Sequence, residues 1–212
     1  MYAFLLTTPN YLIPVPNQPK YILSLGEKEI SNMKILRILL VVLALLASAF
    51  VFVRFYYTKS FSPSASEKYE NNGLVITVDY CQPSKKDRLI FGEEKDKALV
   101  PYGKWWRTGA NEATVIKFSK DVNIAGKSLK SGTYTLFTIP EKDNWTIIFN
   151  QEVGQWGLSY DEKKNVMTVP VPSSQADSSA EQFKISFVEQ ADGGGMILHW
   201  DTTQVVVPIK VQ

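Results

Sequence analysis

Two patterns of hydrophobic residues divide the chain. From Ile38 to Val53 every residue is apolar except Ser48, and a long apolar run of this kind predicts a helix that crosses a membrane. From Gly73 to the C-terminus, apolar and polar residues alternate in short segments separated by turn residues, which is typical of antiparallel strands. The pattern therefore predicts one N-terminal transmembrane helix followed by an all-β domain.

The predicted membrane helix covers residues 33–57. The stretch from Ile35 to Tyr57 has the length of the ~20 residues that a bilayer core requires, and Arg54 can extend its charge to the membrane surface. A cleavable signal peptide is the alternative, because residues 47–49 (Ala-Ser-Ala) form a cleavage-like site after the apolar run. We favour the retained anchor, since cleavage would expose the apolar segment that follows. A retained anchor predicts a single-pass membrane protein with a cytoplasmic N-terminus and a periplasmic C-terminal domain.

Composition sets the other expected boundaries. Residues 1–32 contain four prolines and no sustained periodicity, which predicts a disordered extension and is consistent with an over-long gene start. Residues 58–72 are polar and interrupted by proline, which predicts a linker. The folded domain is then expected over residues 73–212.

The domain is expected to contain about nine or ten short strands. In the first, residues 73–81, we expect one face to point into the core, and its members are Leu74, Ile76, Val78 and Tyr80. We expect this face to pack against Leu136, Ile147, Phe149, Ile185, Phe187 and Leu198. Residues 166–171 predict a proline-marked edge strand, and residues 172–182 predict a loop. Strands at hairpin spacing predict an antiparallel β-sandwich, with a flattened barrel as the alternative.

Charge and composition narrow the functional classes. The net charge is only +2, from 23 Lys plus Arg against 21 Asp plus Glu, and no basic run alternates with aromatic residues, so a nucleic-acid partner is not expected. The single cysteine, Cys81, and the single histidine, His199, exclude an internal disulfide and a Cys or His cluster with zinc spacing. We expect no cofactor and no metal.

The stretch from Leu99 to Thr114, LVPYGKWWRTGANEAT, is the main candidate site. In an extended segment Trp105 and Trp106 point to opposite faces. One interpretation is structural: Arg107 and Glu112 form a partly buried ion pair and both indoles lie in the core. The other is a recognition surface beside flexible glycines. The candidate ligand-binding residues are Trp105, Trp106, Arg107, Asn111, Glu112 and Asp79.

Three runs in the domain carry a resemblance to a known family. They are WRTGANEA at Trp106–Ala113, SGTYTL at Ser131–Leu136 and QWG at Gln155–Gly157. With them, the chain from about Gly73 to Val211 resembles the bacterial family called domain of unknown function 2911. The resemblance implies an exported domain with a signal peptide or a membrane anchor. It supplies no activity, cofactor or catalytic residue.

Two classes of function follow from these residues. The first is a non-catalytic module of the cell envelope that binds a ligand or a protein through the Trp105–Glu112 stretch. The second is a glycosidase-like hydrolase with Glu112 and Asp79 as its two carboxyl groups. We favour the binding module, because carboxylates beside strands are common without catalysis. Its expected partners are the membrane, through one helix, and an envelope ligand or protein.

Overall fold

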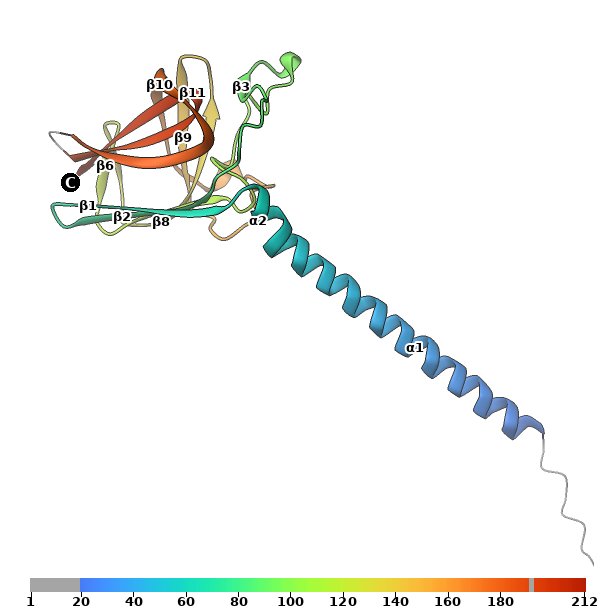
Figure 1. Ribbon diagram of the computed structural model, residues 1–212. Coiled ribbons are helices and arrows are strands. Elements are labelled where there is room, and N and C mark those ends of the chain that lie inside the picture. Colours follow the sequence, from blue (N-terminus) through green and yellow to red (C-terminus); the bar gives the residue numbers. More distant parts are fainter. Residues whose placement is uncertain (1–19, 191–192) are drawn as a thin grey trace, which may run out of the picture. The chain divides into compact units, whose positions relative to one another are not determined.

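The computed structural model describes residues 20–190 and 193–212 (Figure 1). The chain forms two compact units, Met1–Val51 and Phe52–Gln212. Helix α1 runs over Lys20–Phe52 and is followed by a π-helical turn, Val53–Tyr57, and by the short helix α2, Thr58–Phe61.

The helical stretch from Ser31 to Phe61 contains an 18-residue window with a mean hydropathy of 2.8, and it is long and apolar enough to cross a membrane. A signal sequence near the N-terminus meets the same criterion. The helix begins earlier than the sequence predicted, because residues 20–32 are helical where disorder was expected. Pro19 is the last proline before the helix, so no ring interrupts its hydrogen bonds. The expected disorder of residues 1–19 falls outside the described residues.

The β domain contains eleven strands within the described residues. They are β1 Ser64–Asn71, β2 Leu74–Cys81, β3 Phe91–Gly92, β4 Val100–Pro101, β5 Thr114–Phe118, β6 Val122–Ile124, β7 Lys127–Leu129, β8 Gly132–Pro140, β9 Asn144–Asn150, β10 Asn165–Gln190 and β11 Gly193–Val211. Nine of them are hydrogen-bonded in the order β1-β2-β5-β8-β9-β10-β11-β6-β7, all antiparallel, while β3 and β4 form a separate parallel pair. Single-turn 3₁₀ helices occur at Glu94–Asp96 and Glu162–Lys164.

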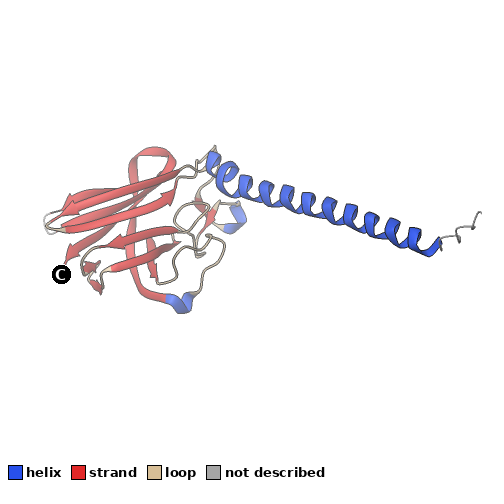
Figure 2. Ribbon diagram, turned by 90° about the horizontal axis from the view of Figure 1, so that it is seen from below, coloured by secondary structure: helices blue, strands red, loops and turns tan. Residues whose placement is uncertain are grey.

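Strand β10 joins the two layers of a sandwich (Figures 1 and 2). Residues 165–172 pair with β9, whereas residues from Ser173 onward pair with β11. Pro170 and Pro172 therefore lie where β10 is the edge of the first layer, as the prolines predicted. The loop expected at residues 172–182 is instead part of this strand. Its exposed small polar residues resemble a loop in composition, but residues 173–175 and Ala180 pair with β11, with a register shift on each side of Ala180.

The predicted linker is also wrong, because most of it is strand β1. Residues Ser64–Asn71 pair with β2 along their whole length, and the side chain of Tyr69 is buried. Asn72 and Gly73 both have positive φ, 50° and 73°, and form the two-residue turn of this hairpin. Asn-Gly is the preferred sequence of such turns, so the domain begins before Gly73.

The core lies between the two layers, where the sequence placed it. Leu74, Ile76, Val78 and Tyr80 are buried in one cluster. All but one of their expected partners are buried there too: Leu136, Ile147, Phe149, Ile185 and Leu198. Phe187 is only partly buried and packs at the margin of the cluster, where its ring stacks on Tyr69.

Candidate functional site

The loop between β4 and β5 is held in one conformation by its own hydrogen bonds. Trp106 exchanges two backbone hydrogen bonds with Thr138 of β8, and its indole Nε1–H donates to the Gly109 carbonyl at 3.0 Å. The Thr114 hydroxyl donates to the Thr108 carbonyl at 2.7 Å. Thr108 and Asn111 have positive φ, a conformation that such compensating bonds must stabilise. These hydrogen bonds therefore fix the backbone of the loop.

The two adjacent tryptophans of this loop have different environments. Trp106 is 8% exposed and packs edge-on or stacked against four aromatic rings. These are Phe91, Trp145, Phe183 and Trp200. Trp105 is 38% exposed and lies on the other side, against Phe137 and Tyr160. The expected opposite orientation is confirmed, and the interpretation that both indoles are in the core is wrong.

Two of the three sequence runs singled out above pair with each other in space. Glu112 and Trp156 form an antiparallel bridge, and the Gly157 N–H donates to the Asn111 carbonyl at 3.0 Å. Gly157 also lies against the side chain of Arg107, because a Cβ at this position would stand 2.9 Å from the Arg107 Cβ. Only glycine leaves room for Arg107 in its present place.

The predicted ion pair between Arg107 and Glu112 does not form. Glu112 Oε1 instead accepts a hydrogen bond from Arg54 Nη1 at 2.8 Å and lies 3.4 Å from Lys59 Nζ. The Arg54 guanidinium also lies 3.4 Å from the centre of the Trp156 ring, which is a cation–π contact. Arg54 and Glu112 are 58 residues apart in sequence, so no local pattern could have predicted this pairing.

Asn111 completes a set of contacts that we call the clasp: Arg54, Lys59, Asn111, Glu112 and Trp156. The Asn111 side-chain amide donates to the carbonyls of Thr58 and Ser62, at 3.5 and 3.3 Å. The clasp therefore links the C-terminal end of the apolar helical stretch to the loop that carries the two tryptophans.

The family model described as "Protein of unknown function (DUF2911)" matches residues 62–209. The chain belongs to this family. No curated protein and no solved structure matched it. The matched region begins within two residues of β1, which agrees with the finding that β1 is part of the DUF2911 domain.

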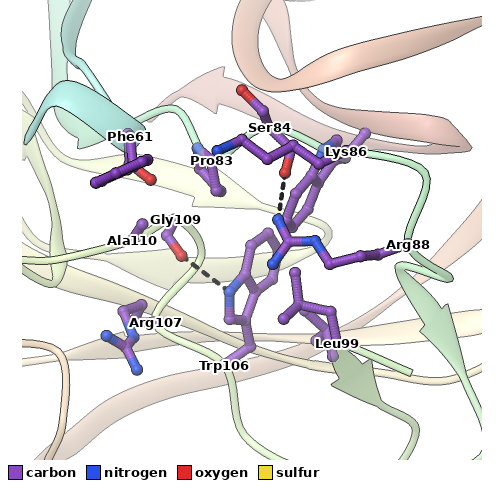
Figure 3. A pocket seen from close by; sticks show the side chains of 13 residues that line it. Phe61, Pro83, Ser84, Lys86, Arg88, Leu99, Trp106, Arg107, Gly109 and Ala110 are labelled. Carbon is purple, nitrogen blue, oxygen red and sulfur yellow. Dashed lines mark hydrogen bonds between the residues drawn. The ribbon is translucent and has the colours of Figure 1, made fainter. Parts of the chain in front are cut away.

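A pocket of about 450 Å³ opens beside Trp106 in the DUF2911 domain (Figure 3). Its cationic lining residues are Lys86, Arg88 and Arg107, and none of the described residues that line it is acidic. Within residues 20–190 and 193–212, none of these three cations forms an ion pair with a carboxylate. The lining therefore carries three positive charges beside aromatic rings, and the Glu181 carboxylate, which does not line the pocket, accepts a hydrogen bond from the Lys86 backbone N–H at 3.0 Å.

Different contacts hold the three cations in place. Arg88 donates to the backbone carbonyls of Lys85 and Ser84. The Lys86 ammonium lies 4.7 Å from the centre of the Phe61 ring, and Figure 3 shows Lys86 and Arg88 across the Trp106 ring from Arg107. Burial lowers the pKa of the Arg107 guanidinium from its ordinary value. Arginine nevertheless stays protonated, so Arg107 is a poorly solvated cation that a bound anion would stabilise.

Sequence reasoning found one of these cations and missed the other two. Arg107 was singled out because it belongs to the tryptophan loop, but Lys86 and Arg88 lie in a short polar connection after β2. The local sequence SKKDR resembles any solvated turn. Only the folded chain brings the two segments to one pocket.

Asp79 and Glu112, the carboxyl pair of the hydrolase alternative, both line a second pocket of about 420 Å³. Desolvation raises the pKa of Glu112, but a backbone hydrogen bond and the charges of Lys59 and Arg54 outweigh this effect and lower it overall. A general acid needs the opposite shift. The geometry of Glu112 therefore favours a structural role in the clasp.

We expect Glu112→Gln to lower the melting temperature of the full chain at pH 7 by a few degrees, because the clasp loses its anion. The pKa of Glu112 is lower in the folded than in the unfolded state. Its contribution is therefore present above the ordinary glutamate value, about 4.3, and is lost as the pH falls through the folded value. Thermal unfolding between pH 7 and pH 3 should show the two proteins converging below about pH 4.

Glu70→Gln is the matched control, because Glu70 forms a more exposed ion pair with Lys68 on β1. An exposed pair contributes only about 0 to 1 kcal/mol, so this variant should melt close to the original protein. Equal melting temperatures for Glu112→Gln and Glu70→Gln at pH 7 would show that the clasp does not stabilise the domain.

Proposed function

We propose that the protein is a membrane-anchored, non-catalytic binding module of the bacterial cell envelope whose DUF2911 domain lies in the periplasm and captures an anionic ligand. The observation that carries the proposal is the pocket lined by Lys86, Arg88 and Arg107 without a carboxylate among its described lining residues. Arg107 is half-buried, and charge of this kind is normally paired in proteins, whereas Lys86 and Arg88 are exposed. An unpaired group of cations at an open pocket is thus suited to a partner that arrives from outside.

The pocket also suits a ligand with an apolar or ring-shaped part. Its floor includes Trp106 and Trp200, and their rings stack on each other at 5.8 Å between centroids. Pockets that bind small molecules combine apolar and aromatic walls with a few fixed polar groups. The ligand class that fits is a small carboxylate or phosphate with an organic body.

Removing one cation should weaken this binding without unfolding the domain. We expect Arg107→Gln to reduce affinity by about 10-fold or more, because a hydrogen bond to a charged group contributes about 1.5–3 kcal/mol. The measurement is the rise in melting temperature of the full chain, in non-ionic detergent, with increasing inorganic phosphate or citrate. A ligand that binds only the folded state raises it by mass action.

A matched pair of lysines separates the pocket from general surface charge. Lys86→Gln should reduce the stabilisation by phosphate or citrate, whereas Lys117→Gln, on an exposed position of β5 outside the pocket, should leave it unchanged. Stabilisation that is absent for both anions, or equal in all the variants, would contradict the proposed anion site.

A further inference from the structure

The wall of the anion pocket includes the residues that end the apolar helix. Phe61 is the last residue of α2 and Ser62 follows it, and both line the pocket. The helical stretch long and apolar enough to cross a membrane also ends at Phe61. The segment that ends at Phe61 thus connects the pocket directly to the apolar helix.

The depth of Phe61 can be estimated from the residues before it. Phe55, Tyr56 and Tyr57 are consecutive and exposed, as in the aromatic belts at membrane–water interfaces. Phe61 follows Tyr57 by one turn of helix, which is about 6 Å at 1.5 Å per residue. The headgroup layer on each side of a bilayer is roughly 5–8 Å thick. Arg54 is bound to Glu112 of the folded domain, so Arg54 cannot lie deeper than the interface. With Arg54 at the interface, Phe61 lies about 10 Å further out along the helix, at the outer edge of the headgroup layer.

The clasp prevents the pocket from drifting away from this position. Asn111 donates to the carbonyl of Thr58, the first residue of α2, and to that of Ser62, which follows it, and Glu112 binds Arg54 one turn before α2. Asn111 and Glu112 belong to the same loop as Arg107. The clasp therefore connects the loop that carries Arg107 to the end of the helix at Phe61.

The rim of the pocket offers an apolar surface as well as positive charge. Phe61 and Leu99 line it and remain 47% and 42% exposed. A free inorganic anion has no apolar part to cover these side chains, whereas a phospholipid places its glycerol and first acyl carbons directly beside its phosphate. The combination of charge, apolar rim and depth matches a lipid better than a solute.

We infer that the anion taken by this pocket is the phosphate of an anionic phospholipid headgroup in the membrane that holds the helix. The inference rests on the proposed function and names its ligand class. The lysine and arginine side chains bind the phosphate oxygens, and Phe61 and Leu99 cover the lipid's glycerol region. The domain is thereby held against its own membrane at a second point.

The test uses the full chain in non-ionic detergent and follows its tryptophan fluorescence, since Trp106 and Trp200 line the pocket. Three probes are titrated: dihexanoyl-phosphatidylglycerol below its micellar concentration, dihexanoyl-phosphatidylcholine, and inorganic phosphate. We expect half-saturation by phosphatidylglycerol at a concentration at least 10-fold below that for phosphate, with no saturation by phosphatidylcholine. Leu99→Ser should weaken the response to phosphatidylglycerol and leave that to phosphate unchanged.

The variants assign the response to the pocket. Lys86→Gln should weaken both phosphatidylglycerol and phosphate binding, and Lys117→Gln should weaken neither. A Lys117→Gln effect equal to that of Lys86→Gln would reveal binding by surface charge and overturn the inference. Intact mass of the membrane-extracted chain is measured first, and cleavage after Ala49 would also overturn it, because the pocket would then have no anchor.

The remaining outcomes separate the inference from the proposed function. Equal half-saturation by phosphate and phosphatidylglycerol, or saturation by phosphate alone, would overturn the lipid and keep an anion-binding pocket. Saturation by phosphatidylcholine at the same concentration as phosphatidylglycerol would also overturn the inference, because the negative charge would not matter. No response to any anion would overturn both.

Discussion

Trp106→Ala is expected to destabilise the domain by about 3–5 kcal/mol, the range for removing a buried tryptophan from a packed core. The indole contacts four other aromatic rings and also donates a hydrogen bond to the Gly109 carbonyl. Its removal leaves a cavity under the pocket and an unpaired carbonyl in the loop. Urea unfolding of the full chain in non-ionic detergent, followed by circular dichroism, measures the free energy of unfolding.

Trp105→Ala provides the matched control one residue away. Trp105 is partly exposed and has two aromatic neighbours, so its loss should cost about 1 kcal/mol. Where Trp106→Ala fails to fold, Trp106→Phe keeps the ring in the core and should show a smaller loss in the same direction. Equal losses for Trp105→Ala and Trp106→Ala would contradict the assignment of Trp106 to the floor of the pocket.

Ile76→Ala is expected to lower the free energy of unfolding by about 2–5 kcal/mol. Ile76 has no exposed surface and is paired with Phe118 across β2 and β5, at the centre of the interlayer core. The protein cannot close the resulting space without moving a strand. The same urea unfolding experiment applies.

Val75→Ala, on the opposite face of the same strand, is the control for Ile76→Ala. Val75 is only partly buried, so its truncation should cost less than half as much. A loss for Val75→Ala as large as that for Ile76→Ala would show that the other face of β2 is the buried one.

The candidate site was only partly predictable from the sequence. The Trp105–Glu112 stretch was recognisable because large aromatic and charged residues between glycines need either a core or a ligand to cover them. The partner of Glu112 could not be recognised in the sequence, because Arg54 belongs to the segment assigned to the membrane. The residues predicted to form one site also belong to two, since Arg107 lines one pocket while Glu112 and Asp79 line another.

The linker and loop predictions failed for a common physical reason. Residues 64–71 and 172–182 are rich in small polar and charged residues, which favour solvent in a local view of the sequence. In the fold, all of residues 64–71 and part of residues 172–182 pair with neighbouring strands, while most of these side chains remain outside. Backbone hydrogen bonding depends on a partner strand, and the identity of that partner is not written in local composition.

The sequence by itself determined the apolar helix, the antiparallel sandwich and the inward face of β2, because each follows from a repeating pattern of hydrophobic residues. It also determined that Trp105 and Trp106 point in opposite directions, since side chains alternate along an extended backbone. Only the tertiary structure decided that Glu112 binds Arg54 and that Arg107 shares a pocket with Lys86 and Arg88. Side-chain partners distant in sequence are selected by how the strands and loops pack, and no local periodicity records that choice.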